Sequence, residues 1–388
     1  MKPKHLPPAK NAPGVPLTAD TVGPVARGHP WVYKEGVVGK LPAPGTVVQL
    51  LDGKGQPVGW GLADEGPIAV RVLGRSLQPL RELLELQRER MLRQRGLIGP
   101  DTDCYRLCNG EGDGLGGLVL DRYADILVVR LYSKAWESHL PALVDTFKDV
   151  SGIKTIYRRF GVGRVDDKEG GETLFGPPPP ELRQVQEHGM KLLVRVEKGQ
   201  KTGLFLDQRE HRRMVRGWAS GRTVTNLFSY NGGFSVAAAL GGAKRVTSVD
   251  QAGPALEDAK EIFRLNGLDP DRHVFEVADV FKWEGKAVDL LICDPPSLAH
   301  ARADEREARR AYRDLHRKVG PLAKEFLVTS SCTARMSWDR WEESIREGLK
   351  GGWAWLHRSG ESVDHPVGIG HPEGRYLKFA LLGRMGTH

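Results

Sequence analysis

Thr223–Asp250 reads TVTNLFSYNGGFSVAAALGGAKRVTSVD, a run that passes from strand-like to helix-like character and back. The β-branched residues 223–225 predict a buried strand, and the small residues of 234–240 predict a helix. A second apolar strand follows at 245–249 and ends on Asp250. The run therefore predicts a β-turn-α-β unit of an α/β sheet.

Two features of this unit predict a cofactor that contains a nucleoside. Gly232 and Gly233 lack a Cβ atom, so the backbone can approach a ligand closely. Asp250 can accept both hydroxyls of a ribose. The loop lacks the Gly-x-Gly-x-x-Gly spacing of a pyrophosphate site, and S-adenosylmethionine, which has no phosphate, fits it better. The alternative is an ordinary turn with Asp250 facing solvent.

Charge and composition favour an anionic partner. The formal net charge is +8 and the pI is near 9.3, which points first to nucleic acid, although a merely soluble basic protein has the same signature. No apolar run is long enough to span a membrane and the first residues lack a signal-peptide core, so the sequence predicts a cytoplasmic protein. Its four cysteines show no zinc-ligand spacing, and no metal site is predicted.

Composition shifts divide the chain into four parts. Residues 1–20 hold five prolines and predict a mobile leader. Short strands and turns over 21–75 predict a small β-barrel. Residues 76–189 predict a connecting helix that carries five arginines and has a solvated outer face. They also predict an α/β middle domain in which Glu111 and Asp113 are structural rather than metal ligands. Residues 190–388 predict the catalytic domain.

Three motifs carry a specific resemblance. EKGQKTGLFLDQR at 197–209, NLFSY at 226–230 and DPPS at 294–297 resemble the bacterial 23S ribosomal RNA cytosine-5 methyltransferase family that carries an N-terminal PUA domain. GHPWV at 28–32 and PEGRYLK at 372–378 extend the likeness over most of the chain. The resemblance implies a class I, Rossmann-like S-adenosylmethionine fold, and methylation of cytosine in 23S rRNA or a large-subunit precursor. It also makes a homodimer plausible.

The resemblance further implies which residues contact the cofactor. They are Phe205, Gln208, Phe228, Ser229, Tyr230, Asn231, Gly232, Asp250, Asp279 and Asp294. Asp279 follows an apolar strand, where its carboxylate can accept the adenine amine. The alternative for Asp279 is an N-cap of a helix that starts at Val280.

Methylation of cytosine at C5 needs a nucleophile, because C5 becomes reactive only after addition at C6. Cys332 ends a predicted strand in a small polar turn, which places its thiol at the mouth of the sheet. Asp294 ends another strand, and in this family type it interacts with the base as charge develops there. Cys293 is the competing thiol. Side chains alternate between the two faces of a strand, so that of Cys293 points away from that of Asp294, which predicts a packing role. The alternative for Cys332 is a small buried hydrophobe.

Basic and aromatic residues in two regions are candidates for RNA contact. The N-terminal set lies in the predicted barrel and the other set lies on a helix predicted over 301–319, where Tyr312 would stack on a base: Arg27, His29, Lys34, Arg309, Tyr312 and Arg313. The alternative for the charged residues is a solvated surface.

Two other functions remain open. A guanine-N7 or exocyclic-amine methyltransferase would use the same fold, although amine-methylating enzymes commonly carry an aromatic residue where Ser297 stands. A catalytically silent RNA-binding assembly factor is the second alternative. Asn231 stands where a threonine-like residue is usual, and Glu210 with His211 departs from the family pattern, so the target nucleotide stays open.

Overall fold

The computed structural model describes residues 12–161, 169–298 and 305–386, which form two compact units. Unit 1 runs to Val185 and also contains Val194–Leu206 and Val363–Gly374. Unit 2 consists of Gln186–Leu193, Asp207–Ser362 and the chain from Arg375 onward. The predicted catalytic domain, 190–388, therefore gives two of its segments to unit 1. No helix in the described residues is both long and apolar enough to cross a bilayer.

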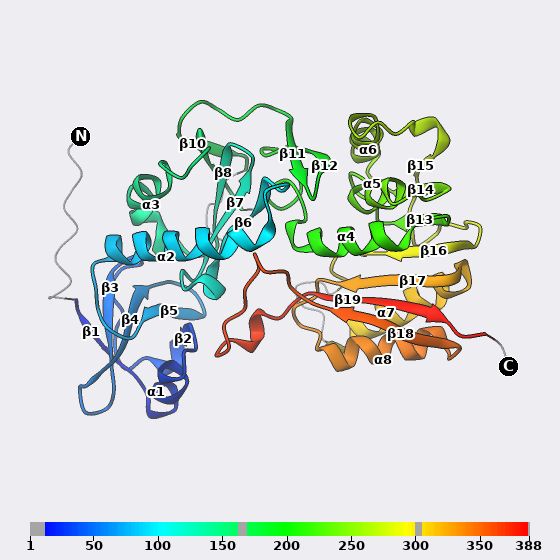
Figure 1. The fold of residues 1–388 in the computed structure, drawn as a ribbon. Helices are drawn as coiled ribbons and strands as arrows, with labels where there is room; N and C mark the ends of the chain where they lie inside the picture. The colour runs from blue at the N-terminus through cyan, green and yellow to red at the C-terminus, as the bar shows by residue number, and fades with distance from the viewer. Residues whose placement is uncertain (1–11, 162–168, 299–304, 387–388) are drawn as a thin grey trace. The chain divides into compact units, whose positions relative to one another are not determined.

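The N-terminal part of unit 1 is a five-stranded sheet with the order β1-β3-β4-β5-β2 (Figure 1). Its elements are β1 (Gly14–Pro16), α1 (Ala19–Ala26), β2 (Trp31–Tyr33), β3 (Val47–Leu51), β4 (Pro57–Ala63) and β5 (Ile68–Gly74). β1 pairs in parallel with β3, and Val15 and Leu17 are buried in the core. The prediction of a leader over residues 1–20 is therefore wrong for 14–20, because their apolar side chains complete this sheet. Residues 1–11 lie outside the described part.

A second sheet of unit 1 has the order β10-β9-β8-β7-β6. Its strands are β6 (Cys104–Asn109), β7 (Leu118–Tyr123), β8 (Ile126–Leu131), β9 (Thr155–Arg159) and β10 (Gly171–Phe175). The helices α2 (Leu80–Arg95) and α3 (Leu140–Phe147) pack with it in one apolar core, which also includes Trp60 and Leu62 of the first sheet. The shared core joins the predicted barrel and the predicted middle domain.

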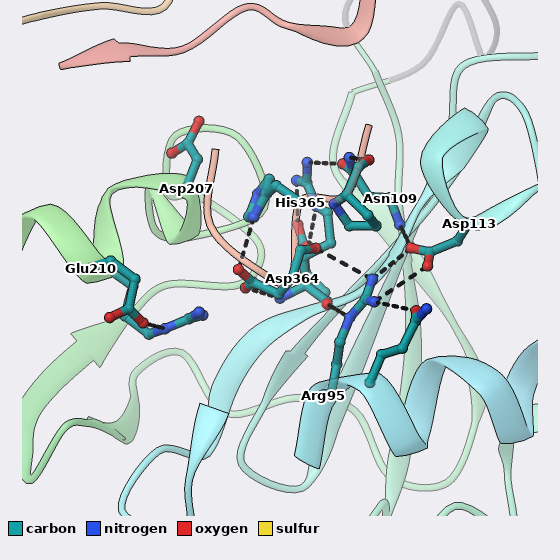
Figure 2. Close-up of polar contacts among 12 residues, drawn as sticks. Arg95, Asn109, Asp113, Asp207, Glu210, Asp364 and His365 are labelled. Carbon is teal, nitrogen blue, oxygen red and sulfur yellow. Dashed lines mark hydrogen bonds and ion pairs between the residues drawn. The ribbon is translucent and has the colours of Figure 1, made fainter. Parts of the chain in front are cut away.

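Buried ion pairs hold unit 1 together. The Nη2 atom of Arg95 lies 2.5 Å from Oδ2 of Asp113, and the same nitrogen donates to the Asp364 carbonyl at 3.3 Å (Figure 2). Arg95 is only 4% exposed, so it does not belong to the solvated outer face that the sequence predicts for this helix. Glu111 pairs with Arg71 at 2.9 Å, which together with the Asp113 pair confirms the structural role predicted for both acids.

Unit 2 is built on a seven-stranded sheet with the order β15-β14-β13-β16-β17-β19-β18 (Figure 1). The strands are β13 (Thr223–Leu227), β14 (Arg245–Asp250), β15 (Val274–Val277), β16 (Val288–Cys293), β17 (Ala323–Ser331), β18 (Trp353–Ser359) and β19 (Lys378–Arg384). The first five are parallel, and β19 runs antiparallel to both β17 and β18. The predicted β-turn-α-β unit is β13, α5 and β14.

Five α-helices lie in the described residues of unit 2. They are α4 (Arg209–Trp218), α5 (Gly233–Leu240), α6 (Gly253–Leu265), α7 (Glu305–Val319) and α8 (Trp338–Leu349). α4 packs on α5, while α7 and α8 pack together and share a core with the centre of the sheet. The helix predicted at 301–319 is thus observed from Glu305, and residues 301–304 lie outside the described part. A two-stranded sheet of β11 (Arg183–Glu187) and β12 (Met190–Val194) lies where the chain passes between the units.

Candidate active site

The predicted catalytic and cofactor residues of unit 2 gather at one edge of its sheet. β13 to β17 are parallel, so their carboxyl ends lie along the same edge. In strand order these ends lead into the loop 228–232, Asp250, Asp279, Asp294 and Cys332. Open α/β sheets bind ligands at this edge, next to the point where the strand order reverses, which lies here between β13 and β16.

The loop after β13 adopts an unusual backbone. Phe228, Tyr230 and Gly232 have φ angles of 58°, 49° and 77°, which only glycine adopts without strain. The amide of Ser229 donates to the Val249 carbonyl at 3.0 Å, and its buried hydroxyl has no hydrogen-bond partner among the described residues. A buried hydroxyl without a partner costs free energy unless a ligand satisfies it. The loop thus offers a polar group to a bound molecule.

Asn231 supports this loop from behind. Its side chain is 7% exposed, and Nδ2 donates to the Leu193 carbonyl at 3.3 Å. A Cβ on Gly232 would lie 2.9 Å from the Cβ of Ala259, so the glycine is needed for packing on α6 as well as for its positive φ. The amide of Asn231 therefore already has a partner within unit 2.

Asp250 is held by backbone amides. Its Oδ2 atom accepts from the amide of Tyr230 at 2.7 Å, and its Oδ1 atom accepts from the amide of Ala252 at 2.8 Å. A carboxylate has about four acceptor positions, so each oxygen keeps one for a ligand hydroxyl. The two amides fix the plane in which those positions lie. This geometry fits the ribose diol that the sequence predicts.

Asp279 is exposed and lies beside apolar side chains. Its Oδ1 atom accepts from the amide of Phe281 at 3.0 Å in a turn, and no helix starts at Val280, so the N-cap alternative is wrong. Phe281 is 51% exposed, and its ring lies 5.5 Å from that of Phe228. Sequence reasoning missed Phe281, because an aromatic residue after a strand reads as core. Nζ of Lys282 lies 3.8 Å from Oδ2 of Asp279. An exposed carboxylate in the same turn as an exposed phenyl ring suits the amine edge and face of a purine.

Asp294 is held by neutral side chains. Its Oδ1 atom accepts from Nε2 of Gln208 at 3.0 Å and from the hydroxyl of Ser330. The Oε1 atom of Gln208 accepts from Nδ1 of His211, and Nε2 of His211 lies 3.0 Å from the hydroxyl of Ser359. Burial lowers the pKa of His211 to about 3, so the ring is neutral and its tautomer is set by the glutamine.

This chain of hydrogen bonds changes the interpretation of two residues. Gln208 is 3% exposed and contacts Asp294, so its amide orients the carboxylate in addition to any contact with a cofactor. His211 was noted only as a departure from the family pattern. Its stacking on Phe379, with ring centroids 3.9 Å apart, joins residues too distant in sequence for a pattern to reveal.

Cys332 follows β17 and is partly exposed, whereas Cys104, Cys108 and Cys293 are buried. Burial raises the pKa of the Cys293 thiol well above its usual value, and Cys293 packs in the core with Leu291 and Tyr312. These findings agree with the packing role predicted for Cys293. Among the four cysteines, Cys332 is the one that is not buried.

The candidates for RNA contact in unit 1 differ in their surroundings. Arg27 and Lys34 are exposed. His29 is partly buried, with Nε2 3.6 Å from Glu373 and its ring 5.9 Å from that of Trp31. Phe205 also belongs to unit 1, where Nζ of Lys201 lies 4.4 Å from its ring centre. RNA contact for the first three and cofactor contact for Phe205 stay predictions.

The structure corrects the candidates on α7. Tyr312 is fully buried, and its hydroxyl lies 3.1 Å from that of Thr333, so the prediction that its ring stacks on a base is wrong. This face of the helix is turned toward the end of β17, where Thr333 follows the strand. Arg309 lies 2.8 Å from Glu343, and Arg313 lies 2.9 Å from Asp314, so both arginines already have acidic partners. RNA contact by either arginine stays a prediction.

Comparisons with known proteins agree with this architecture. Residues 109–333 match the model of the S-adenosylmethionine-dependent methyltransferase family, and residues 15–75 match a PUA-like domain. The ribosomal RNA large subunit methyltransferase of Deinococcus radiodurans is 36% identical over 97% of this chain and 98% of its own. The ribosomal RNA large subunit methyltransferase I of Erwinia tasmaniensis is 35% identical over 91% and 94%. A methyltransferase structure complexed with SAH superposes with a TM-score of 0.85, at 26% identity over 96% of this chain and 99% of that one.

Proposed function

This chain belongs to the ribosomal RNA large subunit methyltransferase I family, which is S-adenosylmethionine-dependent, and we propose that it forms 5-methylcytosine in 23S rRNA through a covalent bond from Cys332. The observation that carries the proposal is the position of Cys332. It is the partly exposed cysteine, and β17, which it follows, pairs directly with the strand that leads into Asp294. Cys332 and Asp294 thus follow the carboxyl ends of two adjacent parallel strands.

The residues at the carboxyl edge fit S-adenosylmethionine. Asp250 offers acceptors for the ribose hydroxyls, the hydroxyl of Ser229 lacks a partner among the described residues, and Asp279 with Phe281 suits an adenine. The family's cofactor supplies an electrophilic methyl group when it is bound. The loop 228–232, Asp250 and Asp279 would hold the cofactor. Activation of the cytosine is assigned to Asp294 and Cys332, which follow β16 and β17 on the other side of the point where the strand order reverses.

Cys332 makes C5 of the cytosine nucleophilic. Its thiolate sulfur would add to C6, the C5–C6 double bond would break, and the electron pair would be placed on C5. C5 would then bond to the methyl carbon of the cofactor while the bond from that carbon to the sulfonium sulfur breaks, so that S-adenosylhomocysteine leaves. A base next takes the proton from C5, the double bond forms again, and the C6–S bond breaks to release the thiolate. The cytosine leaves its stack to reach the site.

We assign to Asp294 the task of holding a proton at N3 of the cytosine, because this proton, and not the carboxylate itself, offsets the negative charge that thiolate addition puts on the ring. Gln208 and Ser330 both donate to the Oδ1 atom of Asp294, which fixes the carboxylate plane before the substrate arrives. Such preorganisation lowers the barrier, because the site need not reorient when charge appears. Pro295 is buried directly after Asp294 and restricts the turn further.

The net charge of +8 supports binding to the phosphates of RNA, and Arg27 and Lys34 are exposed for such contact. Phosphate neutralisation releases counterions, so we expect RNA affinity to fall steeply with salt. The protein would act in the cytoplasm, on 23S rRNA or a large-subunit precursor. A homodimer remains part of the proposal, and the mass of the protein in solution tests it.

Methyl transfer to unmethylated large-subunit RNA tests the function. Wild type, Cys332→Ala and the matched control Cys293→Ala are given labelled S-adenosylmethionine, and the product nucleosides are separated. We expect 5-methylcytidine from wild type and Cys293→Ala but not from Cys332→Ala. A methylated guanosine made equally by all three would contradict the cytosine assignment. No transfer by wild type would favour an assembly factor.

A further inference from the structure

A lysine lies buried at the end of the strand next to Cys332. Lys378 begins β19, pairs in register with Ser331 of β17, and has no exposed surface. Its Nζ atom donates to the Thr333 carbonyl at 3.0 Å and to the Tyr376 carbonyl at 2.9 Å. The ammonium is therefore fixed against the backbone of the residue that follows Cys332.

Thr333 is held on its other polar atoms as well. Its hydroxyl lies 3.1 Å from the hydroxyl of Tyr312 and 3.2 Å from that of Ser297, and its amide donates to the hydroxyl of Ser331 at 3.2 Å. Together with Lys378, these contacts come from α7, β17, β19 and the turn after Asp294. The backbone that carries the thiol is thus anchored from four directions.

The charge of Lys378 also acts on Cys332. No carboxylate lies within 4.0 Å of its Nζ atom among the described residues. Glu361, whose side chain accepts from the Leu377 amide at 2.8 Å, is near enough to raise the lysine pKa, and so is Cys332. Burial is the larger effect and lowers the pKa of Lys378 to about 8, which leaves the ammonium protonated at neutral pH.

Electrostatic coupling between two groups is reciprocal. If the thiolate of Cys332 favours the charged lysine, the charged lysine favours the thiolate to the same extent. Burying an ammonium that is held only by carbonyl groups costs free energy, whereas an apolar side chain would avoid the cost. Tyr312 and Asp294 are further titratable groups beside the turn. Burial raises the pKa of Tyr312, so it stays neutral, whereas the Asp294 carboxylate, which accepts from the Ser330 hydroxyl, opposes the thiolate that Lys378 favours.

We propose that Lys378 is a positioning residue for the reaction, whose buried ammonium fixes the turn after Cys332 and stabilises the thiolate. The inference rests on the proposed function, because it assigns Lys378 a role through the nucleophile. Lys378 does not touch the substrate in this account, since it has no exposed surface. It acts through the Thr333 backbone and through its charge.

The pH dependence of Cys332 alkylation by iodoacetamide tests the inference without methyl transfer. The other three cysteines are buried, so mass spectrometry of the folded protein reports on Cys332. We compare wild type with Lys378→Gln, which keeps donors but removes the charge, and with Lys378→Met, which removes both. Lys324→Gln, an exposed position on β17, is the matched control.

We expect the alkylation midpoint to rise by about one pH unit in both Lys378 variants and to stay unchanged in Lys324→Gln, as loss of a nearby cation predicts. The rate of methyl transfer should fall about tenfold in Lys378→Gln and further in Lys378→Met, with the KM for RNA unchanged. Circular dichroism confirms that each variant is folded.

Two outcomes separate the inference from the function on which it rests. If Cys332→Ala is inactive but the alkylation midpoints of wild type, Lys378→Gln and Lys378→Met coincide, the role of Lys378 is wrong and the covalent mechanism stands. If Cys332→Ala still forms 5-methylcytidine, the proposed function is wrong and the reaction role of Lys378 falls with it.

Discussion

Charged side chains are stabilised in different ways in the two units. In unit 1, the buried carboxylates of Asp64, Asp113 and Asp121 each lie within 3.0 Å of an arginine nitrogen. At the carboxyl edge of unit 2, Asp250 accepts from two backbone amides and Lys378 donates to two backbone carbonyls. Neither has an ion-pair partner within 4.0 Å in the residues that the structure describes.

The difference separates charges that hold the fold from charges that act on a ligand. In a close ion pair each charge largely cancels the field of the other, so the pair fixes the architecture and acts weakly beyond it. A charge held by neutral dipoles is fixed in place but keeps its field. Unit 2 has both kinds, because Glu187 forms a buried pair with Arg212 of α4 at 2.5 Å. Asp250 and Lys378 at the carboxyl edge are of the second kind.

The largest effect on stability should come from breaking an ion pair of unit 1. Arg95→Met leaves the Asp113 carboxylate buried without its cation, and we expect a loss of about 3–5 kcal/mol in the free energy of unfolding. Urea denaturation measures the loss. Arg93→Met, at an exposed position of the same helix, should change stability by less than about 0.5 kcal/mol. Equal losses in the two variants would contradict the comparison.

Asp294→Asn should have the next largest effect, on the rate of methyl transfer. The variant keeps an oxygen acceptor for Gln208 and Ser330 but removes the charge that faces the base, so we expect a decrease of about 100- to 1000-fold. Asp289→Asn is its control on the same strand, where the carboxylate accepts from the amide and hydroxyl of Thr223 at 2.8 Å. Unchanged turnover in Asp294→Asn would show that this charge does no catalytic work.

Asp250→Ala should weaken cofactor binding and leave RNA binding largely intact. Loss of hydrogen bonds to a charged acceptor predicts about 10- to 100-fold lower affinity for S-adenosylmethionine. Calorimetry of the purified variant measures this affinity, with Glu276→Gln on β15 as an exposed control. Equal affinity in wild type and Asp250→Ala would remove the ribose role.

The smallest effect concerns stability and pH at Lys378. Its pKa is about 8 in the folded protein, below the ordinary lysine value of 10.5, so the unfolded chain binds more protons between these values. The unfolding free energy of wild type should therefore rise with pH in this window relative to Lys378→Met, by at most about 1.4 kcal/mol per unit. Urea midpoints at several pH values test the slope. Parallel curves would mean that the ammonium is not desolvated.

Much of the carboxyl edge could be predicted from the sequence. β-Branched residues predict strands such as 223–227. Because parallel strands align their carboxyl ends, Asp250, Asp294 and Cys332 could be placed at the same edge of the sheet from the sequence alone. Cys332 follows a strand and is partly exposed, whereas Cys293 lies within a strand and is buried. Both positions could be read from the sequence.

The burial of several polar residues could not be predicted from the sequence, because it depends on partners that are distant along the chain. The burial of Arg95 depends on Asp113 and Asp364, and that of Lys378 on a carbonyl 45 residues away. Tyr312 looks like a stacking residue among arginines in the sequence, but it is buried and its hydroxyl contacts Thr333, 21 residues away. A local pattern records the side chain but not the group that neutralises or buries it, so these residues are read as solvated.

The covalent mechanism is tested most directly with RNA that carries 5-fluorocytidine in place of cytidine. Fluorine at C5 replaces the proton that the base must remove, so the C6–S bond cannot be released after methyl transfer. We predict that wild type with S-adenosylmethionine forms a complex with this RNA that survives denaturing electrophoresis, and that Cys332→Ala forms none. No stable complex with wild type, or an equal amount with Cys332→Ala, would contradict the account.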